Sequence, residues 1–448
     1  MSLQHSPEHD VPYHLVSYDA KGLERATRDG PSSFAAISGV GTDAPTDLLF
    51  FSHGWNAGMD DAIEQYGHWV DTMAARNADR ERLVAGEGGF RPLLVGVHWP
   101  SKAWADGDPG STSYGVSSDN GASANGTTDS EDDWQRRLTD EYADRFGDGI
   151  AVRQALATIL DAARRDAAPP TLPDEVSAAY AELDAALGVE SAGPGARPGD
   201  DRQPFDAEEA YQAALLADIA DQVSYGAWVS GGVLAPLRVL SFWAMKSRAL
   251  AFGEGSAARL LRELRAAGDA SMRVHVAGHS FGCIVASAAV GGSARPVQTL
   301  VLLQGAMSLW SFCGDIPAQR GRSGYFHGLV RDRLVDGPTL VTTSRHDRAV
   351  RVFYPLGASA RGDVAYADDG LPVYGGIGTF GVRGSGVELV DEDVTRLDPS
   401  KPLRAGVIYN LDADAVIASG SGIGGAHSDI CHPEIADAFW HAIARGGR

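Results

Sequence analysis

A serine in a sharp turn is the residue of this sequence best suited to chemistry. Ser280 lies within Gly278-His-Ser-Phe-Gly282, between a β-branched run at 273–277 that predicts a buried strand and a small-residue run at 283–290 that predicts a helix. Glycines on both sides of a serine at a strand-to-helix turn permit a tight, strained bend that exposes the hydroxyl. The pentapeptide alone is a weak signal. Its flanking strand and helix make Ser280 a candidate nucleophile rather than an ordinary turn residue.

Two later loops supply a candidate acid and a candidate base. Asp347 follows a strand predicted at 339–344, and His427 lies in a glycine-rich loop after a strand predicted at 404–410. In a parallel sheet, functional groups collect on loops beyond the carboxyl ends of the strands. A serine hydroxyl needs a base to remove its proton, and that base needs an acid to orient it. We therefore predict Ser280, Asp347 and His427 as a catalytic triad, in the chain order Ser, Asp, His.

Other residues compete for these roles. Asp347 could instead form a surface ion pair with a neighbouring arginine, and Asp315 is the main rival acid. His432 is the rival base, but it directly precedes a proline and could simply belong to the entry of a helix. We favour His427 because a glycine-flanked loop lets the imidazole reach the serine. Cys283 we interpret as a small packing residue rather than a second nucleophile.

The loop after the strand predicted at 47–52 completes the expected site. Backbone N–H groups of Phe281 and Trp55 would form an oxyanion hole, and Gly54 would permit the close approach that this requires. We assign Trp55, His279 and Trp99 to substrate binding. We expect Trp99, together with the nearby tryptophan at 104, at the mouth of a pocket. We interpret the adjacent histidine at 53 as a structural hydrogen-bonding residue beneath this loop.

The spacing of apolar runs predicts an α/β fold with a mainly parallel, doubly wound sheet. The predicted strands are 13–18, as an early edge strand, 47–52, 93–99, 273–277, 298–304, 339–344 and 404–410, with a candidate hairpin at 373–394. The predicted helices are 60–77, 134–165, 174–187, 206–223, 255–267, 283–290 and 433–445. We find no internal repeats.

The pattern changes between the third and fourth predicted strands. Residues 106–133 are rich in Gly, Ser, Asn and Asp and predict a long loop, and mostly helical stretches follow. We therefore divide the chain into an N-terminal core part at 1–103, a helical lid or cap insertion at 104–253, and a C-terminal core part at 254–448. Within the insertion, 225–245 is long and apolar enough to be checked as a membrane span, but Pro and Gly interrupt it and favour a buried or lid helix. This stretch could line an acyl-binding pocket or simply pack the lid against the core.

Composition limits the partners. A net charge of −21 argues against nucleic acid and anionic membrane surfaces, which both require basic patches. The N-terminus shows no secretory signal, and three widely spaced cysteines argue against a disulfide framework, so we expect the reducing cytoplasm. The aspartates of the 106–133 loop do not match the spacing of a calcium loop, and we predict no metal site. The oligomeric state is not indicated.

The chain resembles the α/β-hydrolase superfamily. The resemblance rests on Phe51-Ser-His-Gly-Trp-Asn56, Val97-His-Trp-Pro-Ser101, the pentapeptide around Ser280 and Gly425-Ala-His-Ser-Asp429, which are similar to motifs of uncharacterised bacterial members. It covers about 12–77, 92–103 and 273 onward, and leaves out the helical insertion. It implies a serine hydrolase acting on esters, thioesters or amides without metal or organic cofactor. We expect a carboxylic-ester hydrolase with a small-molecule substrate, a lipid-like acyl chain being one option. The alternatives are a thioesterase or amidase with the same triad, and an inactive scaffold that binds a protein partner.

Overall fold

One large sheet forms the centre of the computed structural model, which describes residues 2–28, 30–55, 57–76, 83, 89–101, 131–220, 232–354, 370–420 and 424–445. Within these residues, nine strands pair into the sheet, and a separate two-stranded hairpin is formed by β3 (Ala26–Thr27) and β4 (Gly30–Pro31). The strands of the large sheet are β1 (Leu3–His5), β2 (Pro12–Ser17), β5 (Asp47–Ser52), β6 (Pro92–His98), β7 (Arg273–His279), β8 (Thr299–Leu303), β9 (Thr339–Thr343), β10 (Leu389–Asp393) and β11 (Ile408–Asp412).

The strand order creates a crevice beside β7. The order is β1-β2-β6-β5-β7-β8-β9-β11-β10, and every neighbouring pair is parallel except β1 and β2. After β5 the chain first adds β6 on one side, and much later adds β7 on the other. Such a reversal sends the helices that follow β5 and β7 to opposite faces of the sheet, and α/β sheets bind their ligands beyond the strand ends at such a point. The predicted serine therefore follows a strand at the switch point of the sheet.

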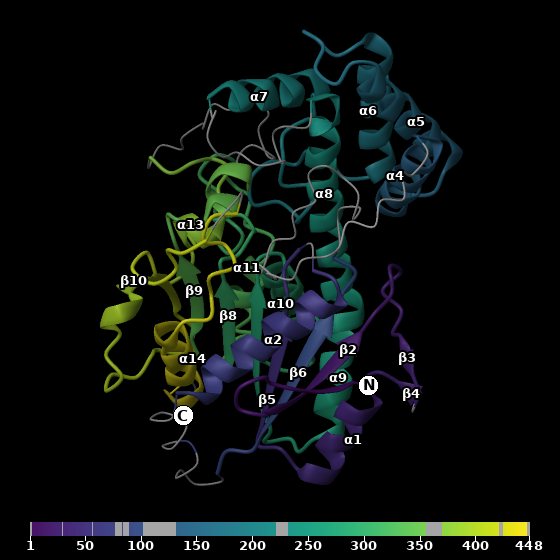
Figure 1. Cartoon of the computed structure of the whole chain (residues 1–448). Helices are drawn as coiled ribbons and strands as arrows, with labels where there is room; N and C mark the ends of the chain where they lie inside the picture. The colour runs from purple at the N-terminus through teal and green to yellow at the C-terminus, as the bar shows by residue number, and fades with distance from the viewer. Residues whose placement is uncertain are drawn as a thin grey trace.

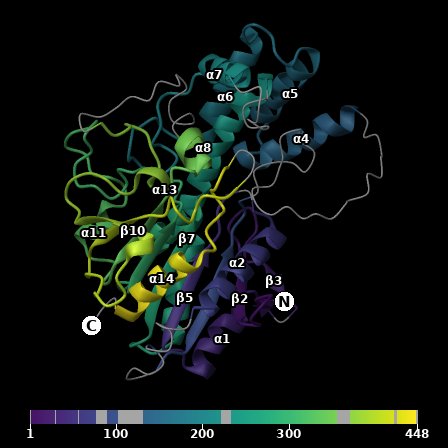
Figure 2. The ribbon, with the colours of Figure 1, turned by 60° about the vertical axis from the view of Figure 1, so that its left-hand side comes forward.

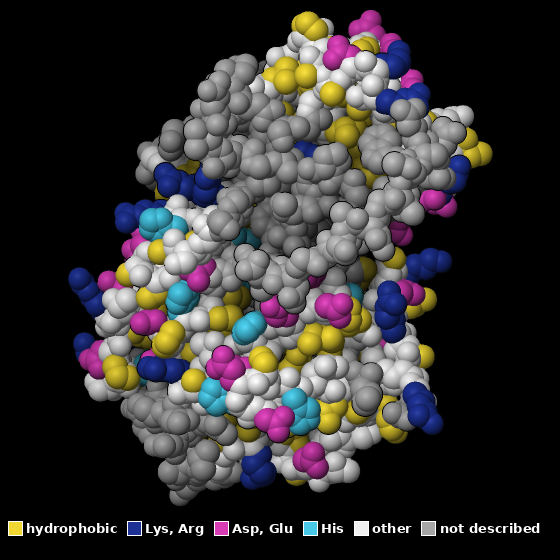
Figure 3. All heavy atoms as spheres, viewed as in Figure 1, with side chains coloured by type: hydrophobic (Ala, Val, Ile, Leu, Met, Phe, Trp, Pro, Cys, Tyr) yellow, Lys and Arg dark blue, Asp and Glu magenta, His cyan; other side chains and the backbone are white. Residues whose placement is uncertain are grey.

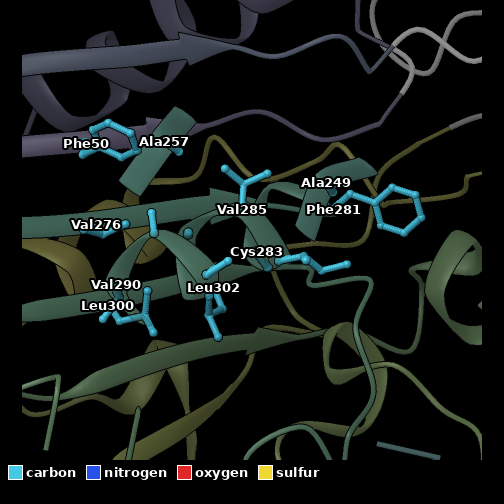
Figure 4. Packing of buried hydrophobic residues seen from close by; sticks show 14 of the residues in the cluster. Phe50, Ala249, Ala257, Val276, Phe281, Cys283, Val285, Val290, Leu300 and Leu302 are labelled. Carbon is cyan, nitrogen blue, oxygen red and sulfur yellow. The ribbon is translucent and has the colours of Figure 1, made fainter. Parts of the chain in front are cut away.

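Helices cover both faces of the sheet, as the doubly wound prediction requires (Figures 1 and 2). Helices α1 (Phe34–Asp43), α9 (Ala258–Ala267) and α10 (Gly282–Gly291) pack in one hydrophobic core, and α2 (Met59–Ala74) and α14 (Pro433–Arg445) pack in the core on the opposite face. Strands β5 and β8 are buried at every position, which explains their continuous apolar sequences. Figure 4 shows Val285 and Val290 of α10 beside Val276, Leu300 and Leu302 of the central strands.

The structure corrects several predicted elements. The run at 13–18 forms β2, but β1 pairs outside it, so β2 is not the edge strand. The hairpin at 373–394 is wrong: this segment holds the short helix α13 (Ile377–Phe380), and β10 pairs in parallel with β11. The single helix at 134–165 is divided into α4 (Glu131–Phe146) and α5 (Ile150–Arg165), because Gly147 between them has a φ of 99°, outside the helical region. Helix α1 was not predicted.

The segment expected to be a cap carries its own hydrophobic core. Helices α4, α5, α6 (Asp174–Leu187), α7 (Ala207–Ala220) and α8 (Ala235–Phe252) contribute to it. In Figure 1, α4 to α7 lie beyond one end of the sheet, and α8 runs from them toward α9. Helix α8 belongs to two cores, since Leu237 and Leu240 pack among the other helices whereas Trp243 and Met245 pack against the sheet. A π-helical turn (Gly253–Ala257) carries α8 into α9. The domain boundaries themselves stay a prediction, and the loop at 106–133 and tryptophan 104 lie outside the described residues, apart from the start of α4.

None of the described helices combines the length and apolarity needed to cross a membrane. The described part of the apolar stretch 225–245 lies in the 3₁₀ turn Gly232–Leu234 and in α8. The three cysteines, Cys283, Cys313 and Cys431, are all free. The cytoplasmic location stays a prediction.

A buried ion pair joins α8 to the rest of the protein. Lys246 is fully buried, and its Nζ lies 2.6 and 2.7 Å from the two carboxylate oxygens of Asp201 and 2.6 Å from the hydroxyl of Tyr354. The Tyr354 hydroxyl also donates to Asp201. Burial lowers the pKa of Lys246 to about 8, against the opposing effect of Asp201. Asp201 lies on the loop before α7, and Tyr354 follows the π-helical turn Ala349–Phe353, so three distant segments meet at this cluster.

Breaking this pair on one side should destabilise the protein. We expect Lys246→Met to lower the free energy of unfolding by about 3 kcal/mol, because it leaves the Asp201 carboxylate buried without its cation. Lys246→Met combined with Asp201→Asn should recover part of the loss, since a neutral amide can still accept the Tyr354 hydroxyl. Urea unfolding measures both. The control is Lys401→Met at the surface pair with Asp398, which should change stability little; equal losses at both lysines would contradict the prediction.

Candidate active site

The backbone at Ser280 has the conformation expected of a strand-to-helix elbow. Its φ is +57°, in the left-handed region that non-glycine residues rarely adopt, and its N–H donates to the carbonyl of Leu303 on the neighbouring strand (3.0 Å). The two flanking glycines are required by space. A Cβ on Gly278 would lie 2.2 Å from the carbonyl oxygen of Gly282, and a Cβ on Gly282 would lie 2.2 Å from that of Ser52. The sequence motif is therefore a steric requirement of this turn.

The loop after β5 lies directly against the elbow. A Cβ on Gly54 would come within 2.7 Å of the Ser280 Cβ, so glycine alone fits. His53 holds this loop: its Nδ1–H donates to the carbonyl of Gly54 (2.8 Å), and its Nε2 accepts the N–H of Trp99 (3.3 Å). Burial lowers the pKa of His53 to about 3, and nearby His98 adds to the effect. His53 is thus a neutral structural residue, in agreement with its sequence interpretation.

Asp347 and His427 meet on the same side of the sheet. Nδ1 of His427 lies 2.8 Å from Oδ2 of Asp347, whose side chain is fully buried. The two loops are also joined by backbone bonds, since the N–H of Ala426 donates to the carbonyl of His346 (3.0 Å). Gly425 has a φ of +56°, and a Cβ there would lie 2.5 Å from that same carbonyl oxygen. Because residue 425 is a glycine, the segment that carries His427 can pack closely against the turn that carries Asp347.

Gln304, which the sequence interpretation missed, fixes the carboxylate of Asp347. Its Nε2 donates to Asp347 Oδ2 (3.0 Å) and to the carbonyl of Gly378 (3.2 Å), while its Oε1 accepts the hydroxyl of Thr342 (2.9 Å). The other carboxylate oxygen, Oδ1, accepts the N–H of Val350 (2.9 Å). Gln304 itself has a φ of +43°, which marks a strained position directly after β8. Asp347 therefore has one orientation available.

His279 links the elbow to the loop of His427. Its Nε2–H donates to the backbone carbonyl of His427 (2.9 Å), and its Nδ1 accepts the side-chain amide of Gln65 on α2 (3.0 Å). These partners fix the tautomer of the ring. Burial lowers the pKa of His279 to about 3, and the proximity of His427 adds to the effect. His279 lines the cavity at Ser280, as expected for substrate binding, but its ring nitrogens are occupied by these structural bonds.

Comparison with known proteins finds a match to one family model. A model of the family described as alpha/beta hydrolase matches residues 199–308, a span that includes β7, the Ser280 elbow, α10 and β8. This match, together with the mainly parallel nine-stranded sheet, supports an α/β-hydrolase superfamily relationship for the chain. No curated protein and no solved structure matches the chain. The matched span begins at 199 and takes in α7 and α8, so the family pattern extends into the segment that the sequence resemblance left out.

The protein has a cavity of about 540 Å³ at this site. Ser280, Phe281, Trp55 and His427 all line it. Trp55 stacks on Phe281 with ring centroids 5.4 Å apart, and Phe242 of α8 meets both rings from the cap side. The predicted serine, histidine and oxyanion residues therefore share one cavity with an aromatic wall.

Trp99 does not line this cavity, so its assignment to substrate binding is wrong. The Trp99 side chain is fully buried, and its indole N–H donates to the carbonyl of His53 (2.9 Å). Its ring stacks on that of His53 at 5.8 Å. Its position just past a strand end predicted an exposed side chain at the mouth of a pocket. The indole is instead buried against His53, next to the loop of Gly54.

The rival residues have other partners. Asp315 accepts the N–H of Gly321 (2.7 Å), a bond that lowers its carboxyl pKa together with Arg320. His432 Nε2 lies 2.8 Å from Asp429 Oδ1, three residues earlier. Cys283 is buried, its thiol donates to the carbonyl of Gly278 (3.1 Å), and burial raises its pKa far above the usual value. This environment suits a packing residue, as interpreted from the sequence.

One group of potential metal ligands lies among the described residues. Glu8, His9 and Asp71 each offer a ligand atom, and these atoms lie within 4.8 Å of one another. The Asp71 carboxylate already accepts the backbone N–H groups of Glu8 and His9, both at 2.9 Å. The group is therefore accounted for as an anchor of the N-terminal segment on α2.

Buried neutral histidines should make stability depend on pH. In the folded protein the pKa values of His53 and His279 are about 3, whereas in the unfolded chain they return to about 6.5. Between these pH values the two histidines are therefore protonated in the unfolded chain and neutral in the folded protein. The free energy of unfolding should therefore fall as the pH is lowered below 6.5, by about 1.4 kcal/mol for each residue at pH 5.5. Urea unfolding at pH 7.5 and 5.5 measures this slope. Equal stability at the two pH values would contradict it, and His68→Gln, at a half-exposed position, is the control that should retain it.

Proposed function

We propose that this α/β-hydrolase cleaves carboxylic esters through an acyl-enzyme formed on Ser280. The observation that carries the proposal is the cavity lined by both Ser280, at a φ of +57°, and His427, whose imidazole is bonded to the buried carboxylate of Asp347. Nucleophile, base and orienting acid are the three roles that acyl transfer needs. They come from loops after β7, β11 and β9, which the sheet brings to one edge.

The hydrogen bonds define how protons would move. His427 donates Nδ1–H to Asp347, which leaves Nε2 as the proton acceptor. In the acylation step the Ser280 Oγ bonds to the ester carbonyl carbon and its proton passes to Nε2. The C–O bond to the alcohol then breaks, and the leaving alkoxide takes the proton from His427. Water repeats the sequence on the acyl-enzyme, so that the acid is released and Ser280 is restored.

Two backbone N–H groups are proposed to stabilise the tetrahedral intermediate. Phe281 is the N-cap of α10, where backbone N–H groups and the helix dipole favour negative charge. Trp55 follows Gly54 on the loop that contacts Ser280 most closely. Fixed donors aimed at a developing oxyanion are commonly the largest single contribution to such reactions. The bond from His53 to Gly54 supports this role, because it holds the loop in place before substrate arrives.

The cavity wall supports an acyl group as the part of the substrate beside the serine. Trp55, Phe242 and Phe281 present aromatic surface there, which suits a small-molecule ester with an apolar acyl chain. Phe242 comes from α8, so the cap segment contributes to the proposed acyl site. The elbow strain, the paired acid and base, and the fixed loop are costs that an inactive scaffold has no need to retain.

Removing the nucleophile tests the reaction class. We expect a fluorophosphonate probe to label the wild-type protein at Ser280, and Ser280→Ala to lower the rate of p-nitrophenyl ester hydrolysis by about 10⁴-fold or more. Mass spectrometry locates the label, and release of p-nitrophenol gives the rate. Unlabelled protein with no ester, thioester or amide turnover would instead support the inactive scaffold. Turnover confined to thioester or amide substrates would move the substrate class and keep the nucleophile.

A second pair of variants tests the base. His427→Ala should abolish nearly all ester hydrolysis, because the other described side-chain and backbone partners of the Asp347 carboxylate, Gln304 and Val350, are N–H donors that cannot accept the serine proton. His432→Ala should retain most of it, since His432 is bonded to Asp429. Steady-state kinetics with one p-nitrophenyl ester compares the two. The reverse result would assign the base to His432.

A further inference from the structure

The cavity at Ser280 continues along helix α2 and changes character as it does so. Beside the serine it is aromatic, with Trp55, Phe242 and Phe281 as its wall. It is also lined by residues on successive turns of α2, including Glu64, His68 and Thr72, and by residues of the segment 428–433, which meets α2 where Cys431 bonds to Thr72. The substrate site thus has an apolar end and a polar arm.

The chemistry of the proposed reaction assigns the polar arm to the leaving group. His427 must deliver its proton to the departing alcohol, so the alcohol lies on the side of the serine toward His427. Ser428, Ile430 and Cys431, which also line the cavity, closely follow His427 in the chain. The bonds from Gln65 to His279, and from His279 to the carbonyl of His427, hold the middle of α2 against this same segment. The acyl chain then occupies the aromatic end.

The charge of the arm is negative. Four carboxylates line the cavity, those of Glu8, Asp61, Glu64 and Asp71, whereas Arg76 is the one Lys or Arg among its described lining residues. Arg76 is neutralised by a two-pronged bond to Asp437. In the same view as Figure 1, Figure 3 shows acidic and histidine side chains gathered on the surface over α2.

Two of these four carboxylates, Asp61 and Asp71, bind backbone N–H groups, and the other two belong to Glu8 and Glu64. Asp61 accepts the N–H of Gly58 at the start of α2 (2.8 Å), and Asp71 accepts two backbone N–H groups of the N-terminal segment. Glu64 is 40% exposed, and its carboxylate lies 3.8 Å from Nε2 of His68, beyond hydrogen-bond distance. Glu64 also directly precedes Gln65, whose amide reaches the elbow histidine. Of the three α2 carboxylates in the cavity lining, the one on Glu64 is not engaged by these backbone bonds, and it is the charge we assign to a leaving group.

We propose that the polar arm binds a cationic leaving group, as in an ester of an amino alcohol, and that Glu64 is a specificity-determining residue for it. This rests on the proposed function, because it assumes acyl transfer to Ser280. A carboxylate next to an ammonium group lowers its free energy in both the bound substrate and the transition state. The preference should therefore appear mainly in KM, with kcat for the deacylation of a common acyl group unchanged.

Matched thioesters test the inference. Butyrylthiocholine carries a quaternary ammonium in its leaving group, 3,3-dimethylbutyl thiobutyrate replaces that nitrogen with carbon, and the thiobutyrate of 2-mercaptoethanesulfonate replaces it with an anion. All three form the same butyryl-enzyme, and thiol release is followed with a chromogenic disulfide. At pH 8, where histidines are ordinarily neutral, and at low salt, we expect kcat/KM to be about tenfold higher for the cationic than for the neutral thioester, and lowest for the anionic one.

The variants assign the effect to the arm. Glu64→Gln should bring the cationic thioester down to the level of the neutral one, and added salt should weaken the preference in the wild type. Glu182→Gln on α6, an exposed carboxylate in the cap and outside the cavity lining, is the matched control and should retain the full preference.

The possible outcomes distinguish failure of the inference about the polar arm from failure of the proposed hydrolase function. Equal rates for the cationic and neutral thioesters in an active enzyme would overturn the inference and keep the proposed hydrolase. A cationic preference that survives in both Glu64→Gln and the double variant with Glu8→Gln would overturn the role of the arm and place the ammonium on the aromatic wall. Loss of all thioester and ester turnover in the wild type would reject the proposed function itself.

Discussion

The close contact between the loops after β5 and β7 is the constraint on which the rest of the site depends. Three glycines make this contact possible. Gly278 and Gly282 allow the tight turn from β7 into α10, and Gly54 allows the loop after β5 to contact Ser280. Because β5 and β7 are neighbours at the switch point of the sheet, one contact fixes both the serine and the N–H groups proposed for the oxyanion. A methyl group at any of these three glycines would clash with the neighbouring backbone or with Ser280 and would disrupt this contact.

The sequence was a good guide wherever a local signal exists. Ser280 has its glycines, Asp347 and His427 follow predicted strands, and the central strands are continuous apolar runs. The sequence was a poor guide where contacts join distant residues. Gln304 and His279 hold the acid and the base, yet Gln304 looks like any strand-end glutamine, and the partner of His279 lies on α2 more than two hundred positions earlier. Trp99 was misplaced for the same reason, since its burial depends on His53.

The helical segment that holds α4 to α8 is joined to the sheet more firmly than an insertion between two strands suggests. Helix α8 contributes to two hydrophobic cores, continues through a π-helical turn into α9, and places Phe242 against Phe281. One turn beyond Phe242, Lys246 binds Asp201 and Tyr354. Tyr354 in turn ends the helical segment that begins two residues after Asp347. The aromatic wall of the cavity and the orienting acid are therefore connected through one buried cluster.

The neutral state of His279 follows from its position and serves the base beside it. Its ring lies 4.9 Å from that of His427, and a positive charge there would oppose the protonation of His427 that acyl transfer requires. Burial lowers the pKa of His279 to about 3, so at neutral pH the ring is uncharged, donates to the carbonyl of His427 and accepts from Gln65. Two adjacent histidines thus differ in role because one has its nitrogens occupied and buried, while the other faces the cavity with one nitrogen paired to a carboxylate.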